Sequence, residues 1–392
     1  MSRTTFAEIN NSILRWARES SGLDLESAAK KVNTSIEKLR HWEEGETFPT
    51  MKQLRKLSKV YMRPIGMFFL PELPEEAERI KDFRRIPEVM QEEMSSALRF
   101  EIRLAFDRRE EAIDLAADLG DEISTITLPI NLHDDTDQVA RRIRDTLGVS
   151  IAEQFSWRSK RQAFNTWRSS LENLGVLIFQ TGILRNLVVK PQEARGFSIS
   201  DQPFPVIVAN SKDHAAARCF TLIHEFVHIL LRDGGLCDLH NPFSARTDSE
   251  RTEVFSNRVA GAVLVPRDEL LNHEVVRNHG QNPEWTNDEL SQLSRAFWVS
   301  SEVILRRLLI LNKTTRDFYQ AWRTETNDQY PGTDDRGEPK ISTPTRVIIK
   351  NGKLFPRLVI RALKSKYITT FEASELLSAG PHRITDVESV VF

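Results

Sequence analysis

The segment that most restricts how this chain can fold is "RCFTLIHEFVHILL", residues 218–231 of 392. Apolar residues surround its circumference, which predicts a largely buried helix from about Ala215 to Leu231. Positions i and i+4 of a helix share one face, so His224 and His228 are expected to point the same way. The fold must therefore bury this helix and still leave room for whatever the two imidazoles contact.

His224, Glu225 and His228 form the HExxH arrangement of zinc metalloproteases. Both histidines can reach one ion through a ring nitrogen at about 2.0–2.1 Å. Glu225 lies about 100° around the helix from the first histidine, where it can act as a base toward water at the ion. The motif fixes only three positions, so a surface or core pair of histidines is the competing interpretation of these residues alone.

A tetrahedral catalytic zinc site also requires a third protein ligand and one open position. Residues 248–266, "DSERTEVFSNRVAGAVLVP", predict a helix that ends before its proline. Glu253 in its first turns is the best candidate for the third ligand, with Glu250 as the rival and Asp248 as a weaker alternative. Asn257 follows one turn later and is a candidate for orienting Glu253 or a histidine ring.

Three buried strands are predicted ahead of the histidine helix. They correspond to "VLIFQ" (residues 176–180), a segment around "GFSIS", and "PVIVAN" (residues 205–210), with a turn at 201–203 between the last two. The "PVIVAN" strand is expected to pair with an extended peptide substrate by strand addition. The predicted peptidase region thus combines a small sheet with active-site helices.

The sequence offers two candidates for the group that would stabilise an oxyanion. Arg218 and His240 are the candidates, and His240 also remains open as a ligand or a loop residue. His214 is expected to be a loop residue. Cys219 lies off the ligand face of the helix and is expected in the core.

Residues 1–75 predict a small module of four or five helices. Two short helices meet at the tight "VNTS" turn, which is the helix-turn-helix pattern, whose second helix enters the major groove. That second helix is expected to present Ile36, Leu39 and Trp42 inward. Its outward residues are Ser35, Glu37, Lys38, Arg40 and His41, of which Ser35, Lys38, Arg40 and His41 are the candidate DNA contacts.

Charge favours this module as the place of any DNA contact. Residues 1–70 hold 12 basic and 8 acidic side chains, a local charge of +4 in a chain of formal charge −2. The "WEEGE" segment would repel phosphate if it faced a duplex. A protein-interaction or dimerisation module is therefore the alternative interpretation.

The segments around the peptidase region are expected to be mostly helical. Residues 91–120 predict one long amphipathic helix. Residues 286–312 predict a second helix-turn-helix-like pair, with Arg295, Arg306 and Arg307 on its exposed side. The tail predicts a strand over 346–350, a turn at Asn351–Gly352, and helices.

Composition places the chain in a broad class. Two cysteines are too few for a disulfide framework. The first 20 residues lack the apolar region of a signal peptide, and the apolar runs are too short to span a membrane. A soluble cytoplasmic protein is expected.

Two stretches resemble known families. "LRWAR", "LESAAKKV", "LRHWEEGETFPT" and "LRKLSKVY" resemble the XRE-type (Cro-like) helix-turn-helix family. "GFSISDQPFPVIVANSKDHAAARCFTLIHEFVHILL" followed by "RTEVFSNRVAGAVLVP" resembles the ImmA/IrrE family of metallopeptidases, which shows a Gly-Phe-Ser strand before its HExxH helix. The matching positions are Gly196, Phe197, Ile207, Asn210, Arg218, Phe220, Thr221, His224, Glu225, His228, Glu253, Asn257, Ala260, Leu264 and Pro266.

The resemblance implies a zincin-like fold, with zinc held by His224, His228 and Glu253 and with Glu225 as general base. The expected fold class is α+β and mostly helical. The expected domains are an XRE-type module (1–75), connecting helices (76–130), a peptidase with a helix-turn-helix-like second half (131–325) and a C-terminal extension (326–392).

The resemblance also implies a function, namely a zinc endopeptidase that cleaves a transcriptional repressor or an antitoxin. Its module would bind DNA or recruit the substrate. One alternative is a DNA-binding regulator whose metal site is structural or sensory, without proteolysis. Another is an interaction protein of a toxin–antitoxin or phage-linked assembly. A homo-oligomer remains open.

Overall fold

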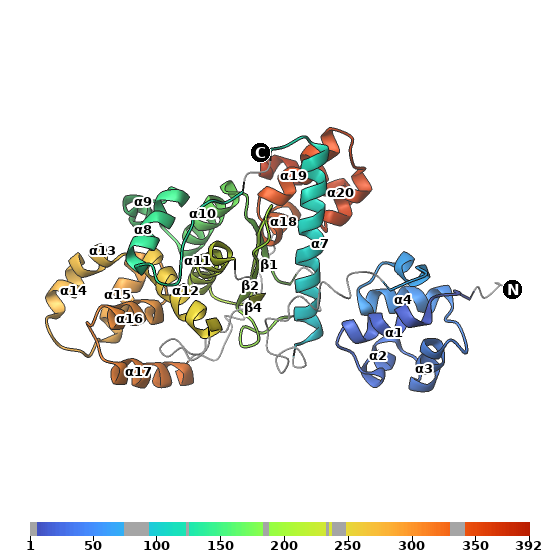
Figure 1. Cartoon of the computed structure of the whole chain (residues 1–392), viewed down its shortest axis with the longest axis horizontal. Coiled ribbons are helices and arrows are strands. Elements are labelled where there is room, and N and C mark those ends of the chain that lie inside the picture. Colours follow the sequence, from blue (N-terminus) through green and yellow to red (C-terminus); the bar gives the residue numbers. More distant parts are fainter. Residues whose placement is uncertain are drawn as a thin grey trace. The chain divides into compact units, whose positions relative to one another are not determined.

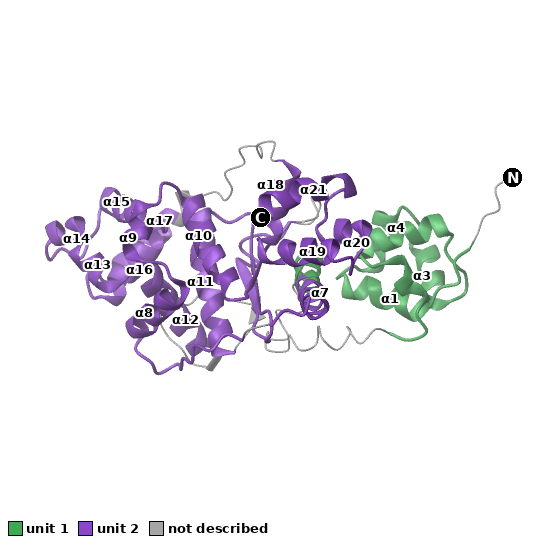
Figure 2. Cartoon of the chain, turned by 90° about the horizontal axis from the view of Figure 1, so that it is seen from above, with its two compact units in different colours: residues 1–104 green, residues 105–392 purple. Residues whose placement is uncertain are grey.

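The computed structural model describes residues 6–73, 94–122, 125–182, 188–232, 235–236, 248–329 and 342–392. The chain divides into two compact units, residues 1–104 and 105–392, which Figure 2 colours separately. The boundary falls within α7 (Ser96–Asp118), which is the predicted long amphipathic helix (Figure 1).

The first unit is a helical module with its own core. It consists of α1 (Asn11–Ser20), α2 (Leu25–Val32), α3 (Ile36–Glu44), α4 (Met51–Tyr61) and a short 3-10 helix, η1 (Ile65–Phe69). Side chains of Asn10, Asp24, Ser35 and Thr50 cap the four α-helices at their N-termini.

The packing of α3 corrects one prediction. Leu39 and Trp42 are buried as expected, but Ile36 is 39% exposed. The later turns of α3 fill the core, and the first turn, which follows the Ser35 cap, leaves Ile36 at the surface. The inward orientation predicted for Ile36 is therefore wrong.

The second unit contains a small mixed sheet. Its strands are β1 (Leu177–Gln180), β2 (Gly196–Ile199), β3 (Val206–Ala209) and β4 (Gly235–Leu236), in the order β1-β3-β2-β4 (Figure 1). β1 runs parallel to β3, whereas β2 runs antiparallel to both β3 and β4. Because β3 is paired on both sides, it offers no free edge, and strand addition to "PVIVAN" is excluded.

Helices between residues 136 and 319 pack against one face of this sheet, where they share a continuous apolar core with Ile178, Ile207 and Ala209. The two central helices are α11 (Ala215–Leu231) and α12 (Asp248–Leu264), which pack against each other. The others before the C-terminal segment are α8 (Thr136–Leu147), α9 (Ile151–Ser156), α10 (Lys160–Asn173), α13 (Arg267–Asn272), α14 (Glu274–His279), α15 (Asn287–Phe297), α16 (Ser301–Ile310) and α17 (Arg316–Gln329). None of the helices in the described part of the chain has the length and apolar character that a membrane crossing requires.

The C-terminal segment is helical throughout its described part. It forms α18 (Thr343–Asn351), α19 (Leu354–Lys364), α20 (Thr370–Leu376), the 3-10 helix η3 (Pro381–Arg383) and α21 (Ile384–Val391). The strand predicted over 346–350 is wrong, because Val347, Ile348 and Asn351 are buried at helical spacing. The segment belongs to the second unit, since Glu172 of α10 accepts hydrogen bonds from the backbone N–H groups of Lys353 (2.6 Å) and Leu354 (3.2 Å).

Candidate metal centre

Three predicted ligand side chains meet between α11 and α12. The Nε2 atoms of His224 and His228 lie 3.0 Å apart. Glu253 places one carboxylate oxygen 3.4 Å from Nε2 of His224 and the other 3.3 Å from Nε2 of His228. The two histidines are buried, and Glu253 is partly buried. The i, i+4 spacing aligns the two rings, and the packing of α12 on α11 supplies the carboxylate.

The spacing of these atoms fits a single tetrahedral ion. Ligand bonds of about 2.0–2.1 Å imply ligand atoms roughly 3.3 Å apart, the edge of such a tetrahedron. The donor atoms of the cluster all lie within 4.8 Å of one another. Two imidazole nitrogens and one carboxylate oxygen are a donor set that zinc accepts, and three protein ligands leave one position open.

The electrostatics of the cluster are consistent with cation binding. Burial lowers the pKa of His224, which favours the neutral ring that ligates metals. Burial alone would raise the pKa of Glu253, but hydrogen bonds and charge from His224 and His228 outweigh it and hold that pKa well below its usual value. Glu253 therefore stays a carboxylate.

Glu225 lies next to the cluster but outside it. Its side chain is 1% exposed, and burial raises its pKa to about 7. A carboxyl group with a pKa near neutrality can both accept and release a proton at the pH of a cell. Glu225 thus remains the candidate general base and is not one of the three clustered side chains.

Sequence reasoning assigned no role to Ser198, which contacts Glu225 directly. The Ser198 hydroxyl of β2 donates a 2.7 Å hydrogen bond to Oε2 of Glu225. Ser198 belongs to the Gly-Phe-Ser segment that carries the family resemblance. Its position two residues after Gly196, on the same face of a strand, is the signal that could have identified it.

On α12, the rival ligand Glu250 and the predicted orienting residue Asn257 lie outside the cluster. Glu250 is partly buried and is not part of the cluster, while Asp248 is the first residue of the helix. Asn257 is 3% exposed, and its Oδ1 accepts a hydrogen bond of 3.4 Å from Nη1 of Arg306 in α16. Arg306 is a second residue near the site that sequence reasoning did not select.

The expected exposure of the arginines in α15 and α16 is partly wrong. Arg295 is exposed, but Arg306 is 9% and Arg307 is 1% exposed. Arg307 donates from Nε to the carbonyl of Val265 and pairs with Asp137. Buried hydrogen-bonded arginines of this kind make α16 part of the packing that supports α12.

Of the two residues considered for an oxyanion role, Arg218 lies in the described part of the chain. Arg218 donates to Oε1 of Gln180 at 2.6 Å and lies 4.9 Å over the ring of Phe164, so its contacts are with β1 and α10. His240 lies outside the described residues. His214 precedes α11 as its N-cap residue.

The first unit presents its candidate DNA contacts on and next to α3. Ser35, Lys38, Arg40 and His41 are all exposed. The Ser35 hydroxyl accepts a hydrogen bond from the backbone N–H of Lys38 at 3.2 Å, so it caps the helix as well. The α2–α3 turn runs through Asn33, which has the left-handed φ of 61°.

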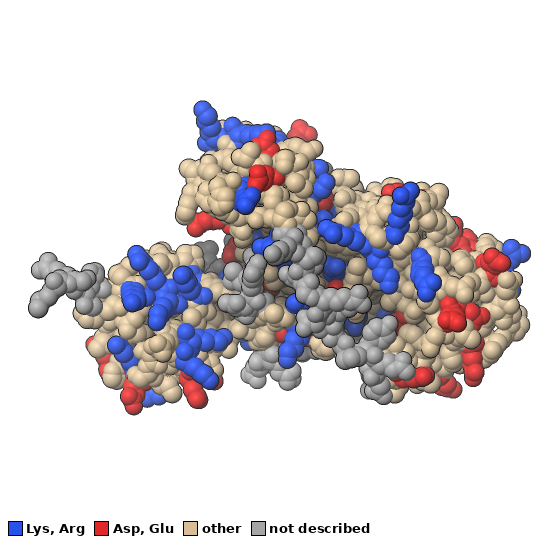
Figure 3. All heavy atoms as spheres, turned by 180° about the vertical axis from the view of Figure 1, so that it is seen from behind, with Lys and Arg blue, Asp and Glu red and all other residues tan. Residues whose placement is uncertain are grey.

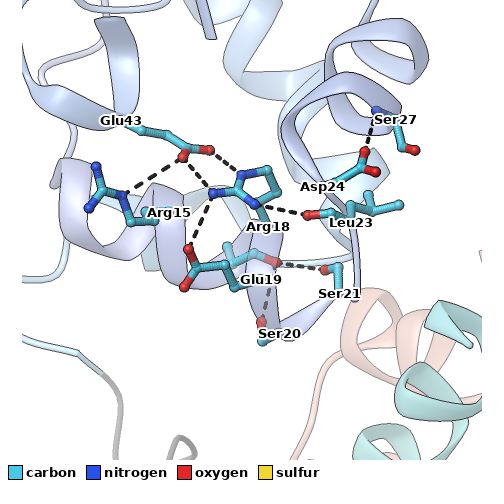
Figure 4. A network of polar contacts seen from close by, with 10 residues as sticks. Arg15, Arg18, Glu19, Ser20, Ser21, Leu23, Asp24, Ser27 and Glu43 are labelled. Atoms are coloured by element: carbon cyan, nitrogen blue, oxygen red, sulfur yellow. Dashed lines mark hydrogen bonds and ion pairs between the residues drawn. The ribbon is translucent and has the colours of Figure 1, made fainter. Parts of the chain in front are cut away.

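The acidic "WEEGE" segment is partly neutralised inside this unit. Glu43 is 3% exposed and forms a two-pronged pair with Arg18 at 2.7 and 2.9 Å, with Arg15 at 3.9 Å (Figure 4). Figure 3 shows Lys and Arg side chains gathered over one face of this unit. The expected repulsion of phosphate is reduced by this inward orientation of Glu43.

Two family profiles match the chain. Residues 172–309 match the peptidase family described as the IrrE N-terminal-like domain, and this range contains the whole cluster. Residues 14–66 match the helix-turn-helix family. Neither the curated proteins nor the solved structures gave a match. The chain therefore contains a region similar to the helix-turn-helix family, followed by a region similar to the IrrE N-terminal-like peptidase family.

Proposed function

We propose that this chain is a zinc-dependent endopeptidase of cytoplasmic proteins. His224, His228 and Glu253 hold the ion, and Glu225 is the general base. The observation that carries the proposal is the convergence of three donor atoms at tetrahedral spacing beside the buried carboxyl group of Glu225. A purely structural metal site has no need of such a base.

The chain's own residues supply the proton transfers of peptide hydrolysis. Zinc, when bound, would polarise the peptide carbonyl and acidify the attacking water. Glu225 accepts a proton from this water as its oxygen attacks the carbonyl carbon. Glu225 then donates that proton to the amide nitrogen as the C–N bond breaks, which regenerates the carboxylate.

The N-terminal module gives the peptidase its cellular target. It binds DNA through Ser35, Lys38, Arg40 and His41. The substrate is a transcriptional repressor or an antitoxin that binds the same DNA close to this module. The proposed division of labour assigns recognition to residues 1–75, proteolysis to residues 131–325, and accessory roles to residues 76–130 and 326–392. The helix-turn-helix match and the local charge of +4 in residues 1–70 support this part.

The proposal is tested by comparing cells that carry the native chain with cells that carry Glu225→Gln. Quantitative proteomics of new protein termini is expected to find a protein that only the native chain cuts. The purified variant is expected to bind as much zinc as the native chain, because Glu225 is not a ligand. If both cells contain the same set of new protein termini although the chain binds zinc, the peptidase proposal fails. The alternative, a regulator with a structural or sensory metal site, would then be supported.

A further inference from the structure

The two carboxylate oxygens of Glu225 differ in their hydrogen bonding, because Ser198 donates to only one of them. Ser198 is 1% exposed, as is Glu225, and its hydroxyl donates to Oε2 at 2.7 Å. Oε1 is also buried, and it accepts no hydrogen bond from any residue in the described part of the chain. Ser198 thus fixes Oε2 by a hydrogen bond, whereas Oε1 receives no hydrogen bond from the described residues.

The contact depends on an unusually close approach of β2 to α11. Gly196 and Ser198 lie on one face of the strand, and Thr221 and Glu225 lie on one face of the helix. A Cβ at Gly196 would come within 2.4 Å of the Thr221 side chain, within 2.8 Å of the carbonyl oxygen of Val208, and within 3.6 Å of Oε1 of Glu225. Because Gly196 has no side chain, β2 can approach α11 closely enough for the short side chain of Ser198 to reach the carboxylate of Glu225.

We infer that Ser198 is a positioning residue for the general base. Its hydroxyl holds Oε2 of Glu225, fixes the rotamer of the carboxylate, and makes Oε1 the oxygen that exchanges the proton. This inference rests on the proposed function, since it specifies which atom of Glu225 acts. In the first step the O–H bond of water breaks and an Oε1–H bond forms, and in the last step that proton moves to the leaving amide nitrogen.

A positioning role predicts that Ser198 and Glu225 are energetically coupled even without metal. The experiment is a double-mutant cycle of Ser198→Ala and Glu225→Ala in the metal-free full-length chain at pH 8, followed by thermal unfolding. Ser198→Ala is expected to lower the unfolding midpoint by about 2–4 °C in the parent and to leave it unchanged in the Glu225→Ala background. Equal shifts in both backgrounds would overturn the inference.

Ser294 provides a matched control. It is also buried, and its hydroxyl donates a 2.7 Å hydrogen bond to the carbonyl of Val299, far along the chain from Glu225. Ser294→Ala is expected to lower the midpoint equally with and without Glu225→Ala. This variant separates loss of any buried serine hydrogen bond from loss of the contact to the base.

Two further readouts use zinc and the substrate that the proteomic comparison identifies. Titration with zinc alone is expected to give the same affinity for Ser198→Ala and the parent. Ser198→Ala is expected to lower kcat by about 10–100-fold with KM changed less than about twofold, because misplacement of the base affects the chemical step. A rise in KM with kcat unchanged would contradict a positioning role.

These readouts distinguish failure of the inference from failure of the proposed function. If the cycle shows coupling but the parent cuts no protein in the proteomic comparison, Ser198 still holds Glu225 and the peptidase proposal fails. If Glu225-dependent cleavage is found but the cycle shows no coupling and kcat is unchanged, the peptidase proposal stands and the role of Ser198 is refuted.

Discussion

Nη1 of Arg306 in α16 donates a hydrogen bond of 3.4 Å to Oδ1 of Asn257 in α12, one turn after Glu253. Arg306 also contacts Glu302 at 3.1 Å and the hydroxyl of Tyr319 at 3.4 Å. The helix pair α15–α16 is thereby linked to the helix that carries the predicted third ligand. Arg306 and Arg307 of α16 contribute to this support from the inside of the unit.

Arg306→Met is expected to lower the free energy of unfolding by about 1–3 kcal/mol, because a buried position loses hydrogen bonds that involve a charged group. Arg295→Met, on the exposed side of the preceding helix, is expected to change it by less than about 0.5 kcal/mol. Urea titrations of both variants measure the difference. Equal effects would mean that burial of Arg306 does not stabilise the unit.

Glu253→Ala is expected to weaken zinc binding by more than about 100-fold, since loss of outer-shell partners alone costs 10–100-fold in other sites. Glu250→Ala removes the same charge one turn earlier and is expected to retain zinc. Competition with a chromogenic chelator measures both affinities. Zinc loss in Glu250→Ala with normal binding in Glu253→Ala would identify the rival residue as the ligand.

Gly196→Ala is expected to destabilise the second unit by about 1–3 kcal/mol, because a new Cβ overlaps both a side chain and the backbone oxygen of Val208. Gly261 lies in α12, and a Cβ there would meet nothing within 4 Å. Gly261→Ala is therefore expected to stabilise the helix by about 0.4–1 kcal/mol. Opposite signs for the two variants in thermal unfolding would support the close strand–helix contact, and a neutral Gly196→Ala would contradict it.

Arg18→Met is expected to cost the first unit about 3–5 kcal/mol, because it leaves Glu43 buried without its main partner. Arg15 lies 3.9 Å from the same carboxylate, but half of its side chain is exposed. Arg15→Met is therefore expected to cost less than about 1 kcal/mol. Circular dichroism of both full-length variants during urea unfolding compares the two arginines, and similar losses would disprove the dominant role of Arg18.

Changing Lys38 and Arg40 together to Ala is expected to weaken DNA binding and to flatten its salt dependence. The logarithmic slope is expected to fall by about 0.9 for each phosphate that the variant no longer neutralises. Arg158 and Lys160, exposed in the second unit, provide a control pair with the same charge change. Binding to a short random-sequence duplex is measured at several salt concentrations. A parent chain that binds no DNA would favour the interaction module.

The sequence was sufficient to predict those features that depend on residues close together in the chain. The period of apolar residues in 215–231 predicted α11, and the four-residue spacing placed the rings of His224 and His228 on one face. Three short apolar runs predicted β1, β2 and β3. These predictions succeed because helix and strand geometry is set within a few residues.

Local patterns were not sufficient for one short apolar segment, whose residues are compatible with either a strand or a helix. The sequence predicts a strand over 346–350, yet this segment forms part of α18. There the tertiary contacts of Val347 and Ile348 outweigh the weak local preference for a strand.

Only the tertiary structure decided which distant side chains meet. The packing of α12 on α11 brings Glu253, rather than Glu250, into the cluster. The approach of β2 to α11 through Gly196 joins Ser198 to Glu225, and the burial of α16 turns Arg306 inward. Such contacts depend on the distances and rotations between elements, which close packing of the whole core determines and which no local pattern encodes.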